Sequence, residues 1–147
     1  DYASQVVRNA KRLAEKMHEL GFNVIGEHLG FTESHQVAVD VREFGGGEKV
    51  ARKLEEVNII LNKNLLPWDD LKHTSDPSGI RIGVQEVTRL GMTENEMEII
   101  AEIMWKAVNE KESSEKLRSE VAELKKEFST IKYAFEETGA YAFPELR

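Results

Sequence analysis

Apolar residues recur every three or four positions along residues 4–20, a spacing that predicts an amphipathic helix. The positions that form its apolar face are Val6, Ala10, Leu13, Ala14, Met17 and Leu20. The same period predicts helices over residues 48–57 and 94–111, and a long C-terminal amphipathic helix over residues 112–139. Thr93 and Glu96 have the spacing of a capping box, which indicates that the third of these helices begins there.

Strict alternation of apolar and polar residues predicts a half-buried strand from Gln36 to Arg42, of a kind typical of antiparallel sheets. Shorter segments predict further strands at residues 22–27, at residues 59–61 as a short buried strand, and around Arg81. The strands are too few, and too rarely joined through helices, for a large parallel sheet. We therefore expect one domain over residues 1–147 with an α+β fold of two layers, in which helices pack on one face of a small, mainly antiparallel sheet.

Arg81 lies between Ile80 and Ile82, with a glycine at each end of the segment. Alternation along a strand places both isoleucines on one face and the arginine on the other. An arginine held on a rigid strand offers a fork of donors to a planar anion such as a carboxylate. The residues alone favour the alternative, an arginine on the solvent face of an edge strand that is paired with a surface carboxylate.

The polar triplet at residues 62–64 precedes a loop over residues 66–78 that is rich in proline, aspartate and serine. Asn62 and Asn64 could hydrogen-bond a heterocycle that has both donors and acceptors. Their spacing alone favours turn formation at the end of a strand. The loop is expected at the surface and is a candidate binding loop, in which Trp68 is interpreted as a lid over the core rather than a stacking platform.

The chain has 147 residues and a net charge of −7, with 40% hydrophobic residues, which indicates a globular protein. The negative charge argues against non-specific binding to nucleic acid or anionic lipid, but a local basic pocket around Lys63 and Arg81 is compatible with it. No cysteine is present, so thiolate metal sites are excluded and a reducing cytoplasm fits. The four histidines lack metal-site spacing. No apolar run approaches the roughly 20 residues of a membrane span.

The motifs Asn62–Lys63–Asn64, Ser78–Gly83 and Thr88–Met92 occur in an order that closely resembles the C-terminal, small domain of serine hydroxymethyltransferase. Residues 5–11, 32–36 and 47–49 agree with the same family, with Ser34 where many members carry asparagine. The amino-acid sequence of residues 30–35 is similar to that of the archaeal branch of this family. The abundance of lysine and glutamate points to a heat-adapted source.

The resemblance implies the small domain of a fold-type I enzyme that uses pyridoxal phosphate. Such an enzyme converts serine and a tetrahydropterin to glycine and methylene-tetrahydropterin, in one-carbon metabolism and glycine biosynthesis. It implies that Arg81 binds the substrate carboxylate, that Asn64 hydrogen-bonds the pterin ring, and that residues 65–75 form the loop beside the pterin. It also implies a cytoplasmic homodimer, and it leaves open which pterin carrier is used.

The family's Schiff-base lysine occurs in a Thr-His-Lys context, whereas Lys72–His73–Thr74 has the opposite order and lies in the loop. Because the first residue is Asp1 rather than methionine, we expect a piece of a longer protein that lacks the large, cofactor-binding domain. We expect this piece to contain no catalytic residue and no metal site, and to fold without binding pyridoxal phosphate or converting serine. The alternatives are a stand-alone regulatory module that binds an amino acid at Arg81, or a dimerisation domain that associates through the last helix.

Overall fold

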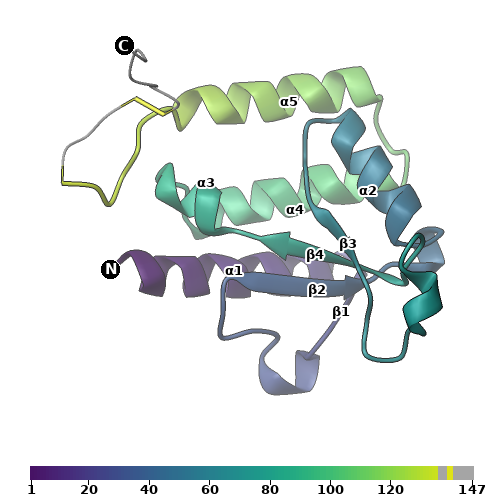
Figure 1. The fold of residues 1–147 in the computed structure, drawn as a ribbon. Coiled ribbons are helices and arrows are strands. Elements are labelled where there is room, and N and C mark those ends of the chain that lie inside the picture. The colour runs from purple at the N-terminus through teal and green to yellow at the C-terminus, as the bar shows by residue number, and fades with distance from the viewer. Residues whose placement is uncertain (136–138, 141–147) are drawn as a thin grey trace, which may run out of the picture.

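The computed structural model describes residues 1–135 and 139–140 and has helices packed on one face of a four-stranded sheet, which confirms the predicted α+β class (Figure 1). Its helices are α1 Tyr2–Glu19, α2 Gly47–Glu56, α3 Gln85–Arg89, α4 Glu94–Val108 and α5 Ser114–Glu127. Its strands are β1 Asn23–Val24, β2 Gln36–Asp40, β3 Asn62–Asn64 and β4 Gly79–Gly83. Short 3-10 helices lie at Glu27–Leu29, Arg42–Phe44 and Leu71–His73.

The strand order is β1-β2-β4-β3, and every neighbouring pair is antiparallel. The predicted strand of alternating valines is β2, in which Val37 and Val39 are buried. Ile80 and Ile82 of β4 are buried on the same side, because Val39 lies opposite Ile80 and Val37 lies opposite Ile82. The helices cover this side of the sheet and leave the other face open.

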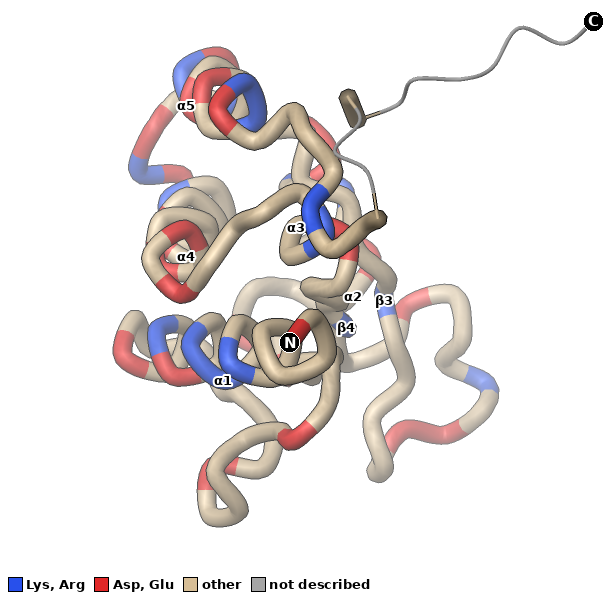
Figure 2. The backbone as a smooth tube through the Cα atoms, turned by 90° about the vertical axis from the view of Figure 1, so that its left-hand side faces the viewer, with Lys and Arg blue, Asp and Glu red and all other residues tan. Residues whose placement is uncertain are grey.

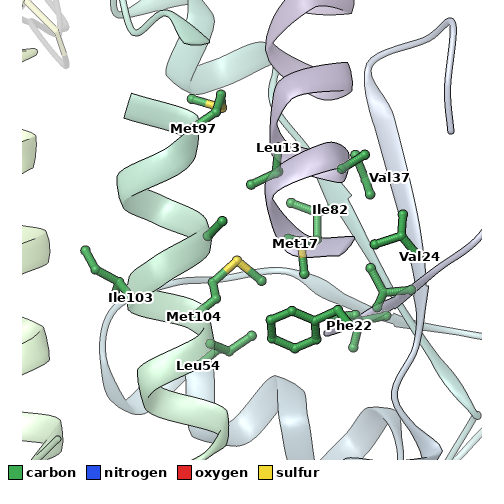
Figure 3. Packing of buried hydrophobic residues seen from close by; sticks show 14 of the residues in the cluster. Leu13, Met17, Phe22, Val24, Val37, Leu54, Ile82, Met97, Ile103 and Met104 are labelled. Carbon is green, nitrogen blue, oxygen red and sulfur yellow. The ribbon is translucent and has the colours of Figure 1, made fainter. Parts of the chain in front are cut away.

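The core lies between the sheet and helices α1, α2 and α4. Met17 of α1 and Leu54 of α2 approach Met104 of α4 around the ring of Phe22, and Leu13 lies further along α1 in the same cluster (Figure 3). Each of these five side chains is at most 2% exposed. Burial of a side chain of this size stabilises the fold by about 1.5–3 kcal/mol, so this cluster fixes the helices against the sheet.

A row of ion pairs joins α1 to α4 outside the core. Arg8 pairs with Glu94 at 3.0 Å, Arg12 with Glu98 at 2.9 Å and Lys16 with Glu102 at 3.1 Å. The partners advance by four residues on both helices, so the two helices run in the same direction. Arg12 also pairs with Glu15 and Glu19, and ion-pair networks of this kind gain in value at high temperature.

Two predicted elements differ from the structure. Residues 59–61 were expected to form a short buried strand, but the strand is β3 at residues 62–64, and Ile60 is 85% exposed. The C-terminal helix was expected over residues 112–139, but α5 ends at Glu127 and packs mainly on α4 rather than on the sheet. Residues 136–138 of that expected range lie outside the described residues. Within the described residues, every helix is too short or too polar to cross a lipid bilayer.

Asn9 is a fully buried polar residue that joins α1 to the segment around α3. Its amide nitrogen donates to the hydroxyl of Thr88 at 2.8 Å and to the carbonyl of Met92 at 2.9 Å. Its amide oxygen accepts from the side chain of Gln5 at 2.9 Å. All the polar atoms of the Asn9 side chain are therefore used inside the core.

Asp40 ends β2 with a carboxylate that is only 4% exposed. Its two oxygens each accept from Nε of Arg42 at 3.0 Å, and the backbone N–H of Arg42 donates to Oδ1 at 3.1 Å. The hydrogen bonds from the Arg42 side chain hold the pKa of Asp40 below its ordinary value of 3.8, although burial opposes this shift.

We predict that Asn9→Ala lowers the free energy of unfolding by about 1–3 kcal/mol, because it leaves buried partners without hydrogen bonds. Urea denaturation measures the change. Asn95→Ala removes an exposed asparagine from the first turn of α4 and is the matched control, with an expected change within about 0.5 kcal/mol. Equal effects of the two substitutions would contradict the role assigned to Asn9.

We predict that Asp40 makes stability depend on pH in acid. A carboxyl whose pKa is lower in the folded state stabilises the fold above its ordinary pKa, and this contribution is lost as the pH falls through the folded-state pKa. Wild type should therefore lose more free energy of unfolding than Asp40→Asn between about pH 5 and pH 2. Parallel pH profiles for the two proteins would show that Asp40 makes no such contribution.

Candidate functional site

The candidate site lies on the open face of the sheet, opposite the helices. Arg81, at the centre of β4, lies opposite Ala38 of β2 and opposite Asn62 of β3. Figure 2 shows β3 and β4 beside the helices, and the loop that follows β3 extending away from α1 and α4. The open face therefore carries Arg81 near its middle and the loop at its edge.

Arg81 has the orientation that its sequence predicted. Ile80 is fully buried and Ile82 is 7% exposed, whereas Arg81 is partly buried on the other face. Among the described residues, the guanidinium forms neither an ion pair nor a side-chain hydrogen bond, so the surface carboxylate of the alternative interpretation is not found there. No described residue therefore competes with a ligand for its donors.

The glycine at the start of β4 serves packing rather than ligand access. A Cβ atom on Gly79 would lie 2.6 Å from the Cγ of Leu66, a distance that real Cβ atoms do not reach. Leu66 is 4% exposed and lies directly over this backbone. The space beside this glycine is therefore filled by the chain's own loop.

Asn62 and Asn64 belong to strand β3, so the prediction that they form a turn is wrong. Asn62 lies opposite Arg81 and Asn64 lies opposite Gly79. Residues two apart on a strand share a face, which places both asparagines on the open face with Arg81. The amide nitrogen of Asn64 donates to the carbonyl of Leu65 at 2.7 Å, which fixes the orientation of the amide.

Lys63 points to the opposite face, so the expected basic pocket around Lys63 and Arg81 does not form. Its ammonium pairs with Glu48 of α2 and donates to the carbonyl of Ser75 at 2.7 Å. The hydrogen bond from Lys63 is the main reason that the pKa of Glu48 is lowered. Lys63 therefore holds the loop to α2 and does not place its charge beside Arg81.

Trp68 is half exposed, so it does not cover the core as predicted. Its ring lies under the guanidinium of Arg42, with 5.6 Å between the guanidinium carbon and the ring centre. This distance is within the range of a cation–π interaction. The loop is thereby held to the end of β2.

Asp69 is a residue of the site that the sequence analysis did not identify. Its Oδ2 accepts from the backbone N–H of Leu66 at 2.9 Å and from the backbone N–H and hydroxyl of Ser78 at 3.0 and 2.9 Å. These hydrogen bonds, chiefly the one from Leu66, lower the pKa of Asp69. Aspartate often bonds nearby backbone in turns, and this tendency was the available signal.

The histidines do not form a site. His18 lies 3.4 Å from Glu27 and contacts the ring of Phe31, while the exposed His35 contributes its backbone carbonyl to Val84. Within the part of the chain that the structure describes, no group of three or more histidines, aspartates or glutamates could hold a metal ion. Arg81 and the neighbouring amides of β3 are therefore kept as the candidates for ligand contacts.

Known proteins share this chain's sequence over nearly its whole length. Residues 1–104 match the model of the serine hydroxymethyltransferase family. A serine hydroxymethyltransferase from Archaeoglobus fulgidus is 67% identical over 147 residues, which cover 100% of this chain and 34% of the relative. The enzyme of that name from Saccharolobus islandicus is 57% identical over 136 residues, covering 92% of this chain and 31% of the relative.

A solved structure is also similar. The crystal structure of L-threonine transaldolase from Pseudomonas fluorescens matches with a TM-score of 0.71 and 34% sequence identity, over 87% of this chain and 28% of that protein. The chain spans about a third of the length of the curated relatives named above. The family match, the archaeal relatives and the shared fold agree with the motifs around Arg81, and the chain belongs to the serine hydroxymethyltransferase family.

Proposed function

We propose that this chain is the small domain of a serine hydroxymethyltransferase, which converts serine and a tetrahydropterin to glycine and methylene-tetrahydropterin. The observation that carries the proposal is Arg81, a guanidinium without a partner among the described residues, on the open face of a sheet that belongs to this family. Residues 1–147 would form one domain, and the large domain would be another part of the same protein.

In this proposal Arg81 binds the carboxylate of serine through two parallel hydrogen bonds. A bidentate pair fixes both the position and the plane of the carboxylate, which a single charge cannot do. The orientation of the amino acid decides which bond at its Cα is aligned for cleavage. Arg81 is therefore assigned to substrate binding, and no residue of this chain is assigned to a catalytic step.

Pyridoxal phosphate, held by residues outside this chain, would supply the electron sink for cleavage at Cα. The open face fits this division of roles, because it offers an anchor for the substrate carboxylate. The lysine nearest to Arg81 on the adjacent strand, Lys63, lies on the opposite face and is paired with Glu48. The open face therefore presents Arg81 as an anchor for the substrate carboxylate, whereas the lysine of β3 points to the other face.

Asn64 is proposed to hydrogen-bond the pterin ring, with residues 65–75 as the loop beside it. An amide can both donate to and accept from a pterin, whose edge has both kinds of group. The contact to Leu65 directs the amide and supports this role. We further propose a homodimer in the cytoplasm of a heat-adapted archaeon, for which the ion pairs between α1 and α4 are suitable.

We predict that Arg81→Lys in the full-length protein weakens serine binding by about 10–100-fold, because an ammonium cannot reproduce two parallel hydrogen bonds to a carboxylate. Steady-state kinetics with serine as the varied substrate measures the change in KM. Arg52→Lys, at an exposed arginine of α2, is the matched control and should leave KM unchanged. Wild-type KM for serine in Arg81→Lys would refute the assignment.

A calorimetric titration of the isolated chain with serine distinguishes the proposal from a stand-alone amino-acid sensor. Half of a two-domain site should bind serine only weakly, with a dissociation constant of about 1 mM or higher. Micromolar binding that Arg81→Lys abolishes would favour the sensor.

We predict that Asn64→Ala raises KM for the pterin about tenfold while KM for serine stays within about twofold, because only the pterin loses a hydrogen bond. The test varies the pterin at saturating serine in the full-length protein. Asn95→Ala serves as the control, since Asn95 lies on α4 away from the open face. Equal effects on both substrates would show that Asn64 shapes the site without contacting the pterin.

A further inference from the structure

The loop of residues 65–78 begins and ends at two residues that are paired in the sheet. It leaves β3 after Asn64 and enters β4 at Gly79, and these two residues lie opposite each other. Arg81 follows two positions later on β4. Any change in how the loop ends are held is therefore transmitted to both proposed ligand-binding residues over a very short length of chain.

Asp69 ties the two ends of this loop together. One oxygen of its carboxylate accepts three hydrogen bonds, from the backbone N–H of Leu66 at the first end and from two donors of Ser78 at the second. Leu66 and Ser78 are 4% and 8% exposed, so these bonds lie in a part of the loop that is largely closed to solvent. Hydrogen bonds to an ionised acceptor are about twice as strong as neutral ones.

Trp68 fixes the loop at a second point. Its ring contacts the guanidinium of Arg42, which in turn pairs with the buried carboxylate of Asp40. Asp40 lies opposite Gly79 in the pairing of β2 with β4. Gly79 thus lies between Asn64 of β3 and Asp40 of β2. Asp69 holds the loop on the side of Asn64, and Trp68, through Arg42, holds it on the side of Asp40.

We propose that Asp69 and Trp68 are positioning residues, which hold the loop of residues 65–78 against the sheet so that Asn64 and Arg81 keep a fixed relative position before ligands bind. This inference rests on the proposed function for the ligands concerned. A site that is already ordered binds without the cost of ordering its groups. Neither side chain needs to touch substrate for this effect.

The first test is amide hydrogen exchange in Asp69→Ala and Trp68→Leu. Exchange at Leu66, Ser78 and the amides of β3 should become at least tenfold faster in both variants, because the contacts that hold the loop ends are lost. Asp70→Ala is the matched control: Asp70 is exposed, and among the described residues its carboxylate accepts only from the N–H of Lys72, two residues along. Unchanged exchange at β3 in Asp69→Ala would overturn the inference, whichever reaction the full-length protein catalyses.

The second test is steady-state kinetics of the full-length protein. Asp69→Ala should raise KM for both serine and pterin by about tenfold and lower kcat less, whereas the isosteric Asp69→Asn should show a smaller rise because its amide oxygen still accepts. A change in KM for neither substrate, together with faster exchange, would show that the loop moves without affecting the site and would overturn the inference. A wild-type protein with no serine-to-glycine conversion would instead refute the proposed function, and the exchange experiment would still decide the inference.

Discussion

The burial of Ile80 and Ile82 is the constraint on which the site depends. Both side chains lie in the core on one face of β4, which is bonded to β2 on one side and to β3 on the other. Turning Arg81 toward the core would bring both isoleucines into water, at a cost of about 1.5–3 kcal/mol for each. The hydrophobic core therefore decides where the guanidinium points, although the two isoleucines are themselves buried on the other face.

Gly79 is the second structural requirement, because several close contacts meet at its backbone. It lies opposite Asp40 and Asn64 in the sheet, and Leu66 occupies the space that a side chain at this position would need. The carbonyl of Gly79 would also lie 2.4 Å from a Cβ atom on Gly47 at the start of α2. The first turn of α2, the loop and the sheet are therefore joined within a few ångströms, next to the proposed ligand-binding residues.

The sequence predicted the features that depend on local pattern. The apolar period predicted α1, the alternation of valines predicted β2, and the position of Arg81 between two isoleucines predicted its face. The error at residues 59–61 arose because apolar residues were expected to be buried, whereas Ile60 lies at the surface beside the strand that the polar triplet forms. The end of α5 was misplaced because the apolar period continues beyond the point where the helix stops.

Features that depend on contacts between distant segments could not be predicted in this way. The absence of a carboxylate partner for Arg81 among the described residues follows from which segments the fold places on the open face. The role of Asp69 depends on two loop ends that meet only because β3 and β4 pair. A resemblance to a family implied roles for Arg81 and Asn64, but the physical reason for their positions required the structure.

A crystal structure of the full-length protein with bound serine tests the central claim most directly. The account predicts that two nitrogens of the Arg81 guanidinium each lie within about 3 Å of a different oxygen of the serine carboxylate, in parallel hydrogen bonds. A serine carboxylate held by other residues, with the Arg81 side chain directed away from it, would contradict the account.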